Sequence, residues 1–261
     1  MAFQHCNVRA RLRERGFLAG SFVEIAAPEI VEILGSAGMD FAVIDCEHAA
    51  LRGPALANLI RASASTGIAP IVRVRENRPA EILEALDLGA AGLHIPQVAT
   101  REQAEAAVRA ARFPPAGERG FNPFVRAAGY GSVEVDQFRR QSDEETLLVL
   151  HVEGGLAVSC AEAIVSVPGV DVAFLGPYDL SMALGIPGQV TDARVLRAAR
   201  AVRGAAERYG VALGAFANSV EHARVWLNEG VRYLAYGVDS RMFLGVAAEV
   251  RRQIDAMRPQ K

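Results

Sequence analysis

The most informative absence in this chain of 261 residues is lysine, which occurs only at the last position. Catalysis through a lysine Schiff base needs an amine held inside the fold, so a chain with no lysine before Lys261 excludes that chemistry. Cysteine is scarce too, since Cys6, Cys46 and Cys160 are three in number and far apart. An odd, scattered set forms neither a disulfide framework nor a zinc ribbon, which indicates a reducing compartment.

Long hydrophobic runs and an excess of charge are also absent. The formal net charge is −2, which gives no footprint for nucleic acid or an anionic membrane surface. The longest apolar runs, such as FAVI at 41–44, are too short to span a bilayer, and no apolar stretch of signal-peptide length follows the basic N-terminus. We expect a cytoplasmic protein without a nucleic-acid or membrane partner. No Pro/Ser-rich linker or charge block divides the chain, which predicts a single domain over residues 1–261.

What the sequence does contain is a regular alternation of apolar, strand-like runs with amphipathic stretches. The eight strand-like runs lie at 17–25, 40–45, 69–74, 92–95, 147–153, 171–175, 211–216 and 231–236. Several are apolar throughout, as parallel strands are when both faces are covered. Eight strand–helix units in about 250 residues predict an α/β fold, a (β/α)8 TIM barrel. A doubly wound sheet is disfavoured because no strand–GxGxxG–helix fingerprint occurs. One long irregular segment, 112–131, is expected to be functional.

Two carboxylates follow neighbouring predicted strands, at the end of the barrel where such enzymes place their chemistry. Glu153 ends the fifth strand-like run, and Asp179 follows the sixth. Converging carboxylates without clustered Cys or His suit a hard divalent cation such as Mg²⁺ or Mn²⁺. The alternative is that they cap the helices that follow, a role for which Asp179 is well placed.

A histidine and an arginine stand at the ends of two other strands. His48 lies just past Asp45 and Glu47, where it could serve as a general base, although a lone histidine is more often a packing or capping residue. Arg73 lies within an apolar run, and an arginine is costly to bury without an anion to meet. A carboxylate or a developing enolate is the expected partner. Arg75, two residues further and on the same strand face, is the competing candidate.

The motifs occur in an order that is typical of one family. IDCEHA, PIVRV, LDLGAAGLHIP, GERG, VEGG and GVDVAFLGPYDLSMALG, between about Gly16 and Arg251, resemble the metal-dependent (class II) pyruvate aldolases of the HpcH/HpaI family, typified by 4-hydroxy-2-oxoheptanedioate aldolase. The resemblance implies a TIM barrel of the phosphoenolpyruvate/pyruvate superfamily that is usually hexameric. It also implies a carbon–carbon lyase that uses a divalent cation, Mg²⁺, Mn²⁺ or Co²⁺. Its substrates would be 4-hydroxy-2-oxoacids, cleaved to pyruvate and an aldehyde.

The resemblance also implies roles for individual residues. His48 matches the family's base, Arg73 the residue that stabilises the enolate, and Glu153 and Asp179 the two metal ligands. Asp87 matches an aspartate that raises the basicity of the histidine. Because Asp87 precedes the fourth strand, at the far end of the barrel, it would act across a subunit contact or be structural.

Further residues complete the site that the resemblance implies. The backbone of Gly176, Pro177 and Tyr178 matches the part that holds the pyruvyl carboxylate, and Asp45 is expected to contact metal-bound water. His151 stands where the family commonly has glutamine, two residues before the metal ligand and on the same strand face. We predict that it is a neutral hydrogen-bond donor to the substrate or to metal-bound water.

Two other functions stay open at this point. One is a lyase of the citrate lyase β-subunit or malyl-CoA lyase kind, which shares the metal carboxylates, although an RSxLFVPG-like opening is missing. The other is a non-catalytic barrel, which the retained polar residues disfavour. Apolar helix faces around Trp226, Phe243 and Leu244 are expected to be exposed, and with the family analogy they predict a homo-oligomer, a hexamer.

Overall fold

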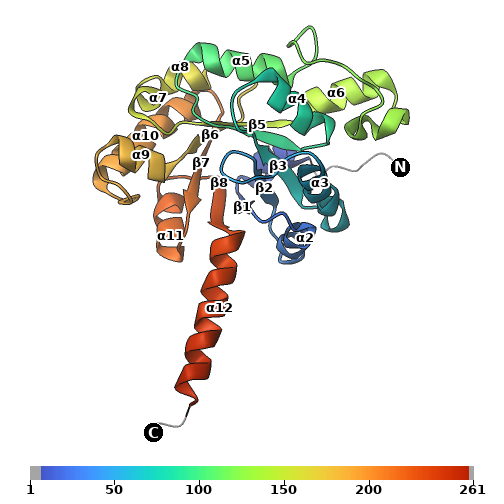
Figure 1. Ribbon diagram of the computed structural model, residues 1–261. Helices are drawn as coiled ribbons and strands as arrows, with labels where there is room; N and C mark the ends of the chain where they lie inside the picture. The colour runs from blue at the N-terminus through green and yellow to red at the C-terminus, as the bar shows by residue number, and fades with distance from the viewer. Residues whose placement is uncertain (1–6, 259–261) are drawn as a thin grey trace.

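Eight parallel strands close into a barrel in which each strand pairs with its neighbours in sequence and β8 pairs with β1 (Figure 1). The computed structural model describes residues 7–258, so Cys6 and Lys261 lie outside the described residues. The strands are β1 (Leu18–Val23), β2 (Phe41–Asp45), β3 (Ala69–Arg73), β4 (Gly92–Ile95), β5 (Leu147–His151), β6 (Val172–Leu175), β7 (Ala212–Ala217) and β8 (Tyr233–Val238). The predicted (β/α)8 barrel is confirmed.

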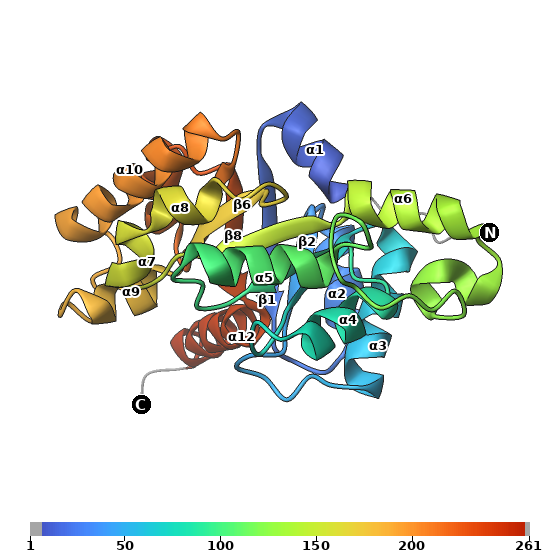
Figure 2. The ribbon, with the colours of Figure 1, turned by 90° about the horizontal axis from the view of Figure 1, so that it is seen from above.

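Helices surround the barrel and connect its parallel strands (Figure 2). They are α1 (Val8–Arg15), α2 (Pro28–Ser36), α3 (Pro54–Thr66), α4 (Pro79–Asp87), α5 (Arg101–Ala111), α6 (Val135–Glu145), α7 (Gly155–Ser159), α8 (Ala161–Val165), α9 (Pro177–Ala183), α10 (Ala193–Arg208), α11 (Val220–Asn228) and α12 (Asp239–Ala256). The segment predicted to be irregular ends in a 3-10 helix, η1 (Arg126–Gly131). Ser219 is the N-cap of α11, where its side chain accepts a hydrogen bond from the His222 N–H.

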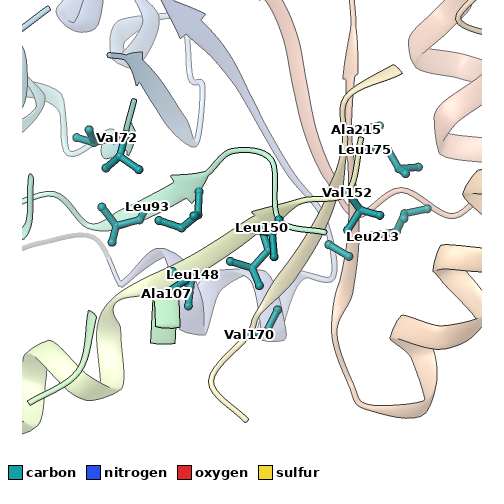
Figure 3. Packing of buried hydrophobic residues seen from close by; sticks show 14 of the residues in the cluster. Val72, Leu93, Ala107, Leu148, Leu150, Val152, Val170, Leu175, Leu213 and Ala215 are labelled. Carbon is teal, nitrogen blue, oxygen red and sulfur yellow. The ribbon is translucent and has the colours of Figure 1, made fainter. Parts of the chain in front are cut away.

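The strands bury two separate cores because successive side chains point to opposite faces. On β2, Phe41 and Val43 point into the barrel, whereas Ala42 and Ile44 face the surrounding helices. The outer core, part of which is shown in Figure 3, is made mostly of aliphatic residues from the strands and helices. This two-sided burial explains why the strands read as continuous apolar runs.

The same alternation delivers polar side chains to one end of the barrel interior. On β3, Arg73 follows Ala69 and Ile71 on the inward face, and on β5, His151 follows Leu147 and Val149 in the same way. These polar residues come last in their strands, so they meet at the carboxyl end of the barrel. The fold therefore creates a site there before any loop is considered.

One sequence expectation about surface helices is wrong. Trp226, expected on an exposed face, is completely buried, because α11 packs against β7 with this side chain in the outer core. Phe243 and Leu244 are exposed as predicted, on α12, which extends away from the barrel (Figure 1).

Among residues 7–258, no helix is both long and apolar enough to cross a membrane.

Candidate active site

A cavity of about 300 Å³ opens at the carboxyl end of the strands. Its lining residues follow or end the strands: Phe22, Glu24, His48, Arg73, His151, Glu153, Phe174, Gly176, Pro177, Tyr178, Asp179, Phe216 and Val238. A second hollow of about 420 Å³ shares His48, Glu153 and Asp179 with it and adds Glu47 and Gln97. Most residues singled out from the sequence thus line one connected space, within reach of a single small molecule.

Arg73 is held at the wall of this cavity by two carboxylates. Its Nε donates to Asp45 Oδ1 at 2.9 Å and its Nη2 to Asp45 Oδ2 at 2.6 Å, which is a bidentate pair. Its Nη1 lies 3.1 Å from Glu47 Oε2. Three of the five N–H groups are thereby used, and the remaining two are available to a ligand in the cavity. The expected anionic partner of Arg73 is present, and it also fixes the plane of the guanidinium.

Burial and this pairing shift the ionisation of all three groups. Burial raises the pKa of Asp45, but the hydrogen bonds and charge of Arg73 outweigh it and lower the pKa below its usual value. Burial lowers the pKa of Arg73, and the hydrogen bonds and charge of Asp45 reverse that effect and raise it. Burial raises the pKa of Glu47 despite the opposing charge of Arg73. Asp45 and Arg73 are therefore a fixed ion pair at neutral pH, and Glu47 is the carboxylate of this group that protonates most easily.

Asp45 has partners other than those predicted for it. Besides Arg73, its Oδ1 accepts the backbone N–H groups of Glu47 at 3.0 Å and His48 at 3.3 Å. The side chain is completely buried and does not line the cavity. Asp45 shapes the turn after β2 and orients Arg73.

Glu153 is the most strongly held carboxylate in the cavity wall. Its Oε1 accepts the backbone N–H of Gln97 at 2.9 Å, and its Oε2 lies 3.2 Å from His151 Nδ1. Burial raises its pKa, but the electrostatic interaction and hydrogen bond with the His151 ring, together with the Gln97 N–H, outweigh burial and lower the pKa to about 2. Gln97 adopts a φ of 55°, a conformation uncommon outside glycine, to direct its N–H at this carboxylate.

Asp179 enters the same cavity from the first turn of α9. It is exposed to the cavity and has no hydrogen-bond or ion-pair partner within the described part of the chain. Neither carboxylate caps the helix after it, because the N-caps of α7 and α9 are Gly154 and Gly176. Gly176 leaves the room that Glu153 occupies, since a Cβ at this position would lie 2.5 Å from Glu153 Oε2.

The two carboxylates fit a hard divalent cation as a partial ligand set. One is already ionised and oriented, and the other has no competing partner. Across residues 7–258, no three His, Cys, Asp or Glu side chains form a complete protein cluster for a metal. Mg²⁺ and Mn²⁺ accept such incomplete sets, because water and substrate oxygens supply the other ligands.

His48 is the most accessible polar side chain of the group. Its side chain is 64% exposed, and its Nε2 lies 3.9 Å from Glu47 Oε2. It lines both hollows, so it can contact a molecule bound in either of them. It is neither a packing residue nor a helix cap here, which favours the functional interpretation of this histidine.

His151 lies deeper than expected and has both ring nitrogens in use. Its Nδ1 meets Glu153, and its Nε2 lies 2.8 Å from Nδ1 of His94 on β4. The other nitrogen of His94 lies 2.9 Å from the hydroxyl of Tyr233 on β8. A hydrogen bond from His151 to substrate, as predicted, would require one of these contacts to break.

Asp87 and the competing Arg75 lie apart from the cavity. Asp87 ends α4 and accepts a hydrogen bond from the buried Arg119 at 2.9 Å. Helix and strand directions alternate in the barrel, so the end of α4 is at the opposite face from His48. Arg75 pairs with Glu81 on α4 and does not line the cavity. Within this subunit, Arg73 is the arginine in position, and Asp87 does not contact the histidine.

Several residues in the cavity wall or buried beneath it were missed by the sequence analysis. Glu24 follows β1 and continues the inward alternation after Phe22, a signal that could have identified it. His94 is the one polar residue of its buried strand. Phe174 and Phe216 come from β6 and β7 and give the cavity an aromatic wall. Aromatic residues on apolar strands cannot be told from ordinary core by pattern alone.

Comparison with known proteins identifies the family of the chain. The model of the HpcH/HpaI aldolase/citrate lyase family matches residues 18–245. The chain belongs to this family. The predicted resemblance is therefore confirmed, and the chain is an enzyme of the aldolase type.

Two relatives and one solved structure illustrate the similarity. The chain is 37% identical over 231 residues to the hydroxypyruvate/pyruvate aldolase of Chromohalobacter salexigens, covering 88% of this chain and 90% of that protein. It is 34% identical over 241 residues to the 2-dehydro-3,6-dideoxy-6-sulfogluconate aldolase of Pseudomonas putida, covering 92% and 93%. The crystal structure of an HpcH/HpaI aldolase/citrate lyase family protein from Burkholderia cenocepacia J2315 superposes with a TM-score of 0.89 at 32% identity, covering 95% and 98%.

Proposed function

We propose that this enzyme catalyses divalent-metal-dependent retro-aldol cleavage of 4-hydroxy-2-oxoacids to pyruvate and an aldehyde, and the reverse addition. One observation supports this most directly: Arg73, Glu153 and Asp179 line one cavity that His48 also reaches. The names of the relatives, which include pyruvate and sugar-acid aldolases, support an oxoacid substrate. The single lysine at the chain end is consistent with a reaction that uses no Schiff base.

The protein side chains divide the proposed reaction among them. His48 takes the proton from the 4-hydroxyl of the substrate. The C3–C4 bond then breaks, the aldehyde leaves, and the negative charge moves onto the pyruvyl enolate. Arg73 directs its two remaining N–H groups at that charge and stabilises it. Return of a proton to C3 gives pyruvate and completes the cycle. The backbone from Gly176 to Tyr178, at the cavity wall, would hold the pyruvyl carboxylate.

Glu153 and Asp179 would hold the cation. When bound there, Mg²⁺, Mn²⁺ or Co²⁺ supplies a Lewis acid for the 2-oxo group of the substrate. The hydrogen bonds from Gln97 N–H and His151 Nδ1 support this role, because they favour the ionised carboxylate that a metal ligand must be.

The test is pyruvate release from a panel of 4-hydroxy-2-oxoacids by chelated enzyme, with metals added back one at a time. We expect Glu153→Ala and Asp179→Ala to abolish the metal-restored activity while the circular dichroism spectrum is unchanged. Glu102→Ala, on the exposed surface of α5, is the control and should retain activity. Full activity of thoroughly chelated enzyme would contradict metal dependence.

A lyase acting on a coenzyme A ester is the second candidate, because the family description includes citrate lyase. The same assay with malyl-CoA distinguishes the two. Cleavage of malyl-CoA without cleavage of the free oxoacids would reverse the assignment. A chain that binds no metal and cleaves neither would be a non-catalytic barrel.

We also propose that the enzyme is a cytoplasmic homo-oligomer, a hexamer by resemblance to the family. Helix α12 supports an oligomer, because Phe243, Val246 and Val250 are spaced along one side of it and are 72%, 65% and 48% exposed. A stripe of this kind on a helix that leaves its own barrel needs an apolar partner. A second copy of this chain is the partner we propose.

A further inference from the structure

A continuous chain of buried polar side chains crosses the barrel interior beneath the cavity. It runs from Tyr233 on β8 through His94 on β4 and His151 on β5 to Glu153, with successive contacts of 2.9, 2.8 and 3.2 Å. Tyr233 and His94 are completely buried, and His151 is 1% exposed. Three polar groups in the centre of a barrel core are tolerated only when each has a hydrogen-bond partner.

The direction of these hydrogen bonds follows from the two ends. Glu153, as a carboxylate, can only accept, so His151 carries its proton on Nδ1. At the other end, the Tyr233 hydroxyl has no hydrogen-bond partner except His94 within residues 7–258. If the hydroxyl accepted from His94, its own proton would be buried without an acceptor, which costs about 1–3 kcal/mol. Tyr233 therefore donates to Nε2 of His94.

Both histidine tautomers are then determined. His94 accepts on Nε2 and donates from Nδ1 to Nε2 of His151, and His151 donates from Nδ1 to Glu153 Oε2. In this arrangement every polar hydrogen of the four hydrogen-bonded side chains has an acceptor. In the reverse direction the hydroxyl proton of Tyr233 has none. Free imidazole in water is not restricted to this tautomer, so the protein selects it through the hydroxyl at the far end.

The Glu153 carboxylate connects these hydrogen bonds to the cavity. Gln97 N–H holds Oε1 and His151 holds Oε2, while Gly176 lies against the group without a side chain. The carboxylate has one donor on each oxygen, and its other lone pairs stay free. Groups that orient a metal ligand in this way commonly change metal affinity by about 10–100-fold when they are removed.

We propose that Tyr233 and His94 are positioning residues that lock His151 in the Nδ1–H tautomer and thereby aim the Glu153 carboxylate at the cation. The tautomer assignment depends only on the hydrogen bonds, whereas the effect on the cation rests on the proposed metal-dependent function. The two parts are tested by separate measurements.

The tautomers can be read from nitrogen-15 magic-angle-spinning NMR of the full-length, metal-free enzyme labelled at histidine. We expect two of the five histidines to be protonated on Nδ1 and bare on Nε2. One of these signals should disappear in His94→Leu and the other in His151→Gln, which assigns them. A His94 protonated on Nε2, or a His151 protonated on both nitrogens, would overturn the proposal.

The effect on the cation can be measured as Mn²⁺ affinity by electron paramagnetic resonance, with no substrate present. Tyr233→Phe removes only the hydroxyl and should weaken Mn²⁺ binding about 10-fold. Tyr236→Phe, on the same strand and without a hydrogen bond to its hydroxyl among the described residues, is the matched control. His151→Gln should retain most of the affinity, because an amide can donate to Glu153 and accept from His94, whereas His151→Leu should lose it.

Melting temperatures accompany each variant, so that a loss of affinity in a folded protein is separated from unfolding. Unchanged Mn²⁺ affinity in folded Tyr233→Phe and His151→Leu would overturn the positioning role. If the unaltered enzyme fails to bind Mn²⁺, the metal-dependent function and the positioning role both fall, while the NMR result still decides the tautomers.

Discussion

At the scale of single residues, the site depends on how each charge is compensated. Arg73 and Asp45 are both removed from water, and each would be costly to bury alone. Their bidentate geometry compensates both charges and, with the contact to Glu47, leaves two N–H groups for a ligand. Glu24 is the opposite case, because burial and the nearby Asp45 and Asp239 raise its pKa. The surroundings of Arg73 and Asp45 stabilise their charges, whereas the surroundings of Glu24 destabilise its negative charge.

Replacing Arg73 with lysine should lower kcat/KM by about 10²-fold or more, as the loss of a transition-state donor does. A lysine keeps the charge but lacks the planar fork that meets Asp45 and an enolate together. The measurement is steady-state pyruvate release with saturating metal. Arg75→Lys is the control and should be nearly unchanged, since Arg75 faces Glu81 outside the cavity. A near-normal Arg73→Lys enzyme would remove Arg73 from the reaction.

Glu24→Gln should raise the melting temperature at neutral pH. A carboxyl whose pKa is raised in the folded state opposes folding once pH exceeds its unfolded pKa, near 4.3. That penalty grows as pH rises through the folded pKa and is absent at lower pH, where both forms are neutral. The gain in melting temperature should therefore vanish in acid. Glu14→Gln, on the exposed side of α1, is the control substitution.

At the scale of elements, strand ends and the first residues of helices bring the ligands together. The turn between β6 and α9 places Gly176 against Glu153, and Asp179 follows three residues later in the first turn of α9. The extended turn after β4 carries Gln97, whose backbone N–H binds the same Glu153. The position of one carboxylate is thus set by three consecutive βα units.

Gly176→Ala should displace Glu153, because the new Cβ would lie 2.5 Å from Oε2. We expect a loss of about 1–3 kcal/mol in the free energy of unfolding, as for other overpacked sites, and weaker Mn²⁺ binding. Denaturant titration and electron paramagnetic resonance measure the two effects. Gly155→Ala at the start of α7 is the control, since nothing lies within 4 Å of its added Cβ. Equal behaviour of the two variants would show that Glu153 needs no space at Gly176.

At the scale of the whole molecule, α12 is a helix whose apolar side chains its own barrel leaves exposed. Figure 1 shows it projecting from the barrel, and its exposed apolar residues continue to Ile254 and Met257 near its end. An 18-residue helix with one apolar stripe is marginal in isolation. Packing against another subunit would supply the burial that it lacks.

The double substitution Phe243→Glu and Leu244→Glu should dissociate the oligomer, because two charges would have to be buried at the contact. Sedimentation velocity at the working concentration measures the change in mass. Replacing Arg251 and Arg252 on the same helix with glutamine is the control and should leave the assembly intact. A strictly monomeric unaltered enzyme would contradict the proposal at once.

The sequence alone determined the barrel, because parallel strands buried on both faces must be apolar and regularly spaced along the chain. It also indicated Arg73, Glu153 and Asp179, since a charge that ends an apolar strand has to meet a partner or a ligand there. The family followed from the order of six short motifs.

Only the tertiary structure decided which groups meet. Asp45 binds Arg73 instead of facing the cavity, and Asp87 binds Arg119 at the other end of the barrel. Trp226 faces the core, because the direction of a short helix face depends on its packing partner. His94, His151 and Tyr233 lie on three different strands. Along the chain, His151 is 57 residues and Tyr233 is 139 residues from His94. Their hydrogen bonds exist because closing the barrel brings the inward-facing side chains of these strands together. The sequence around each residue carries no information about which side chains meet across the barrel.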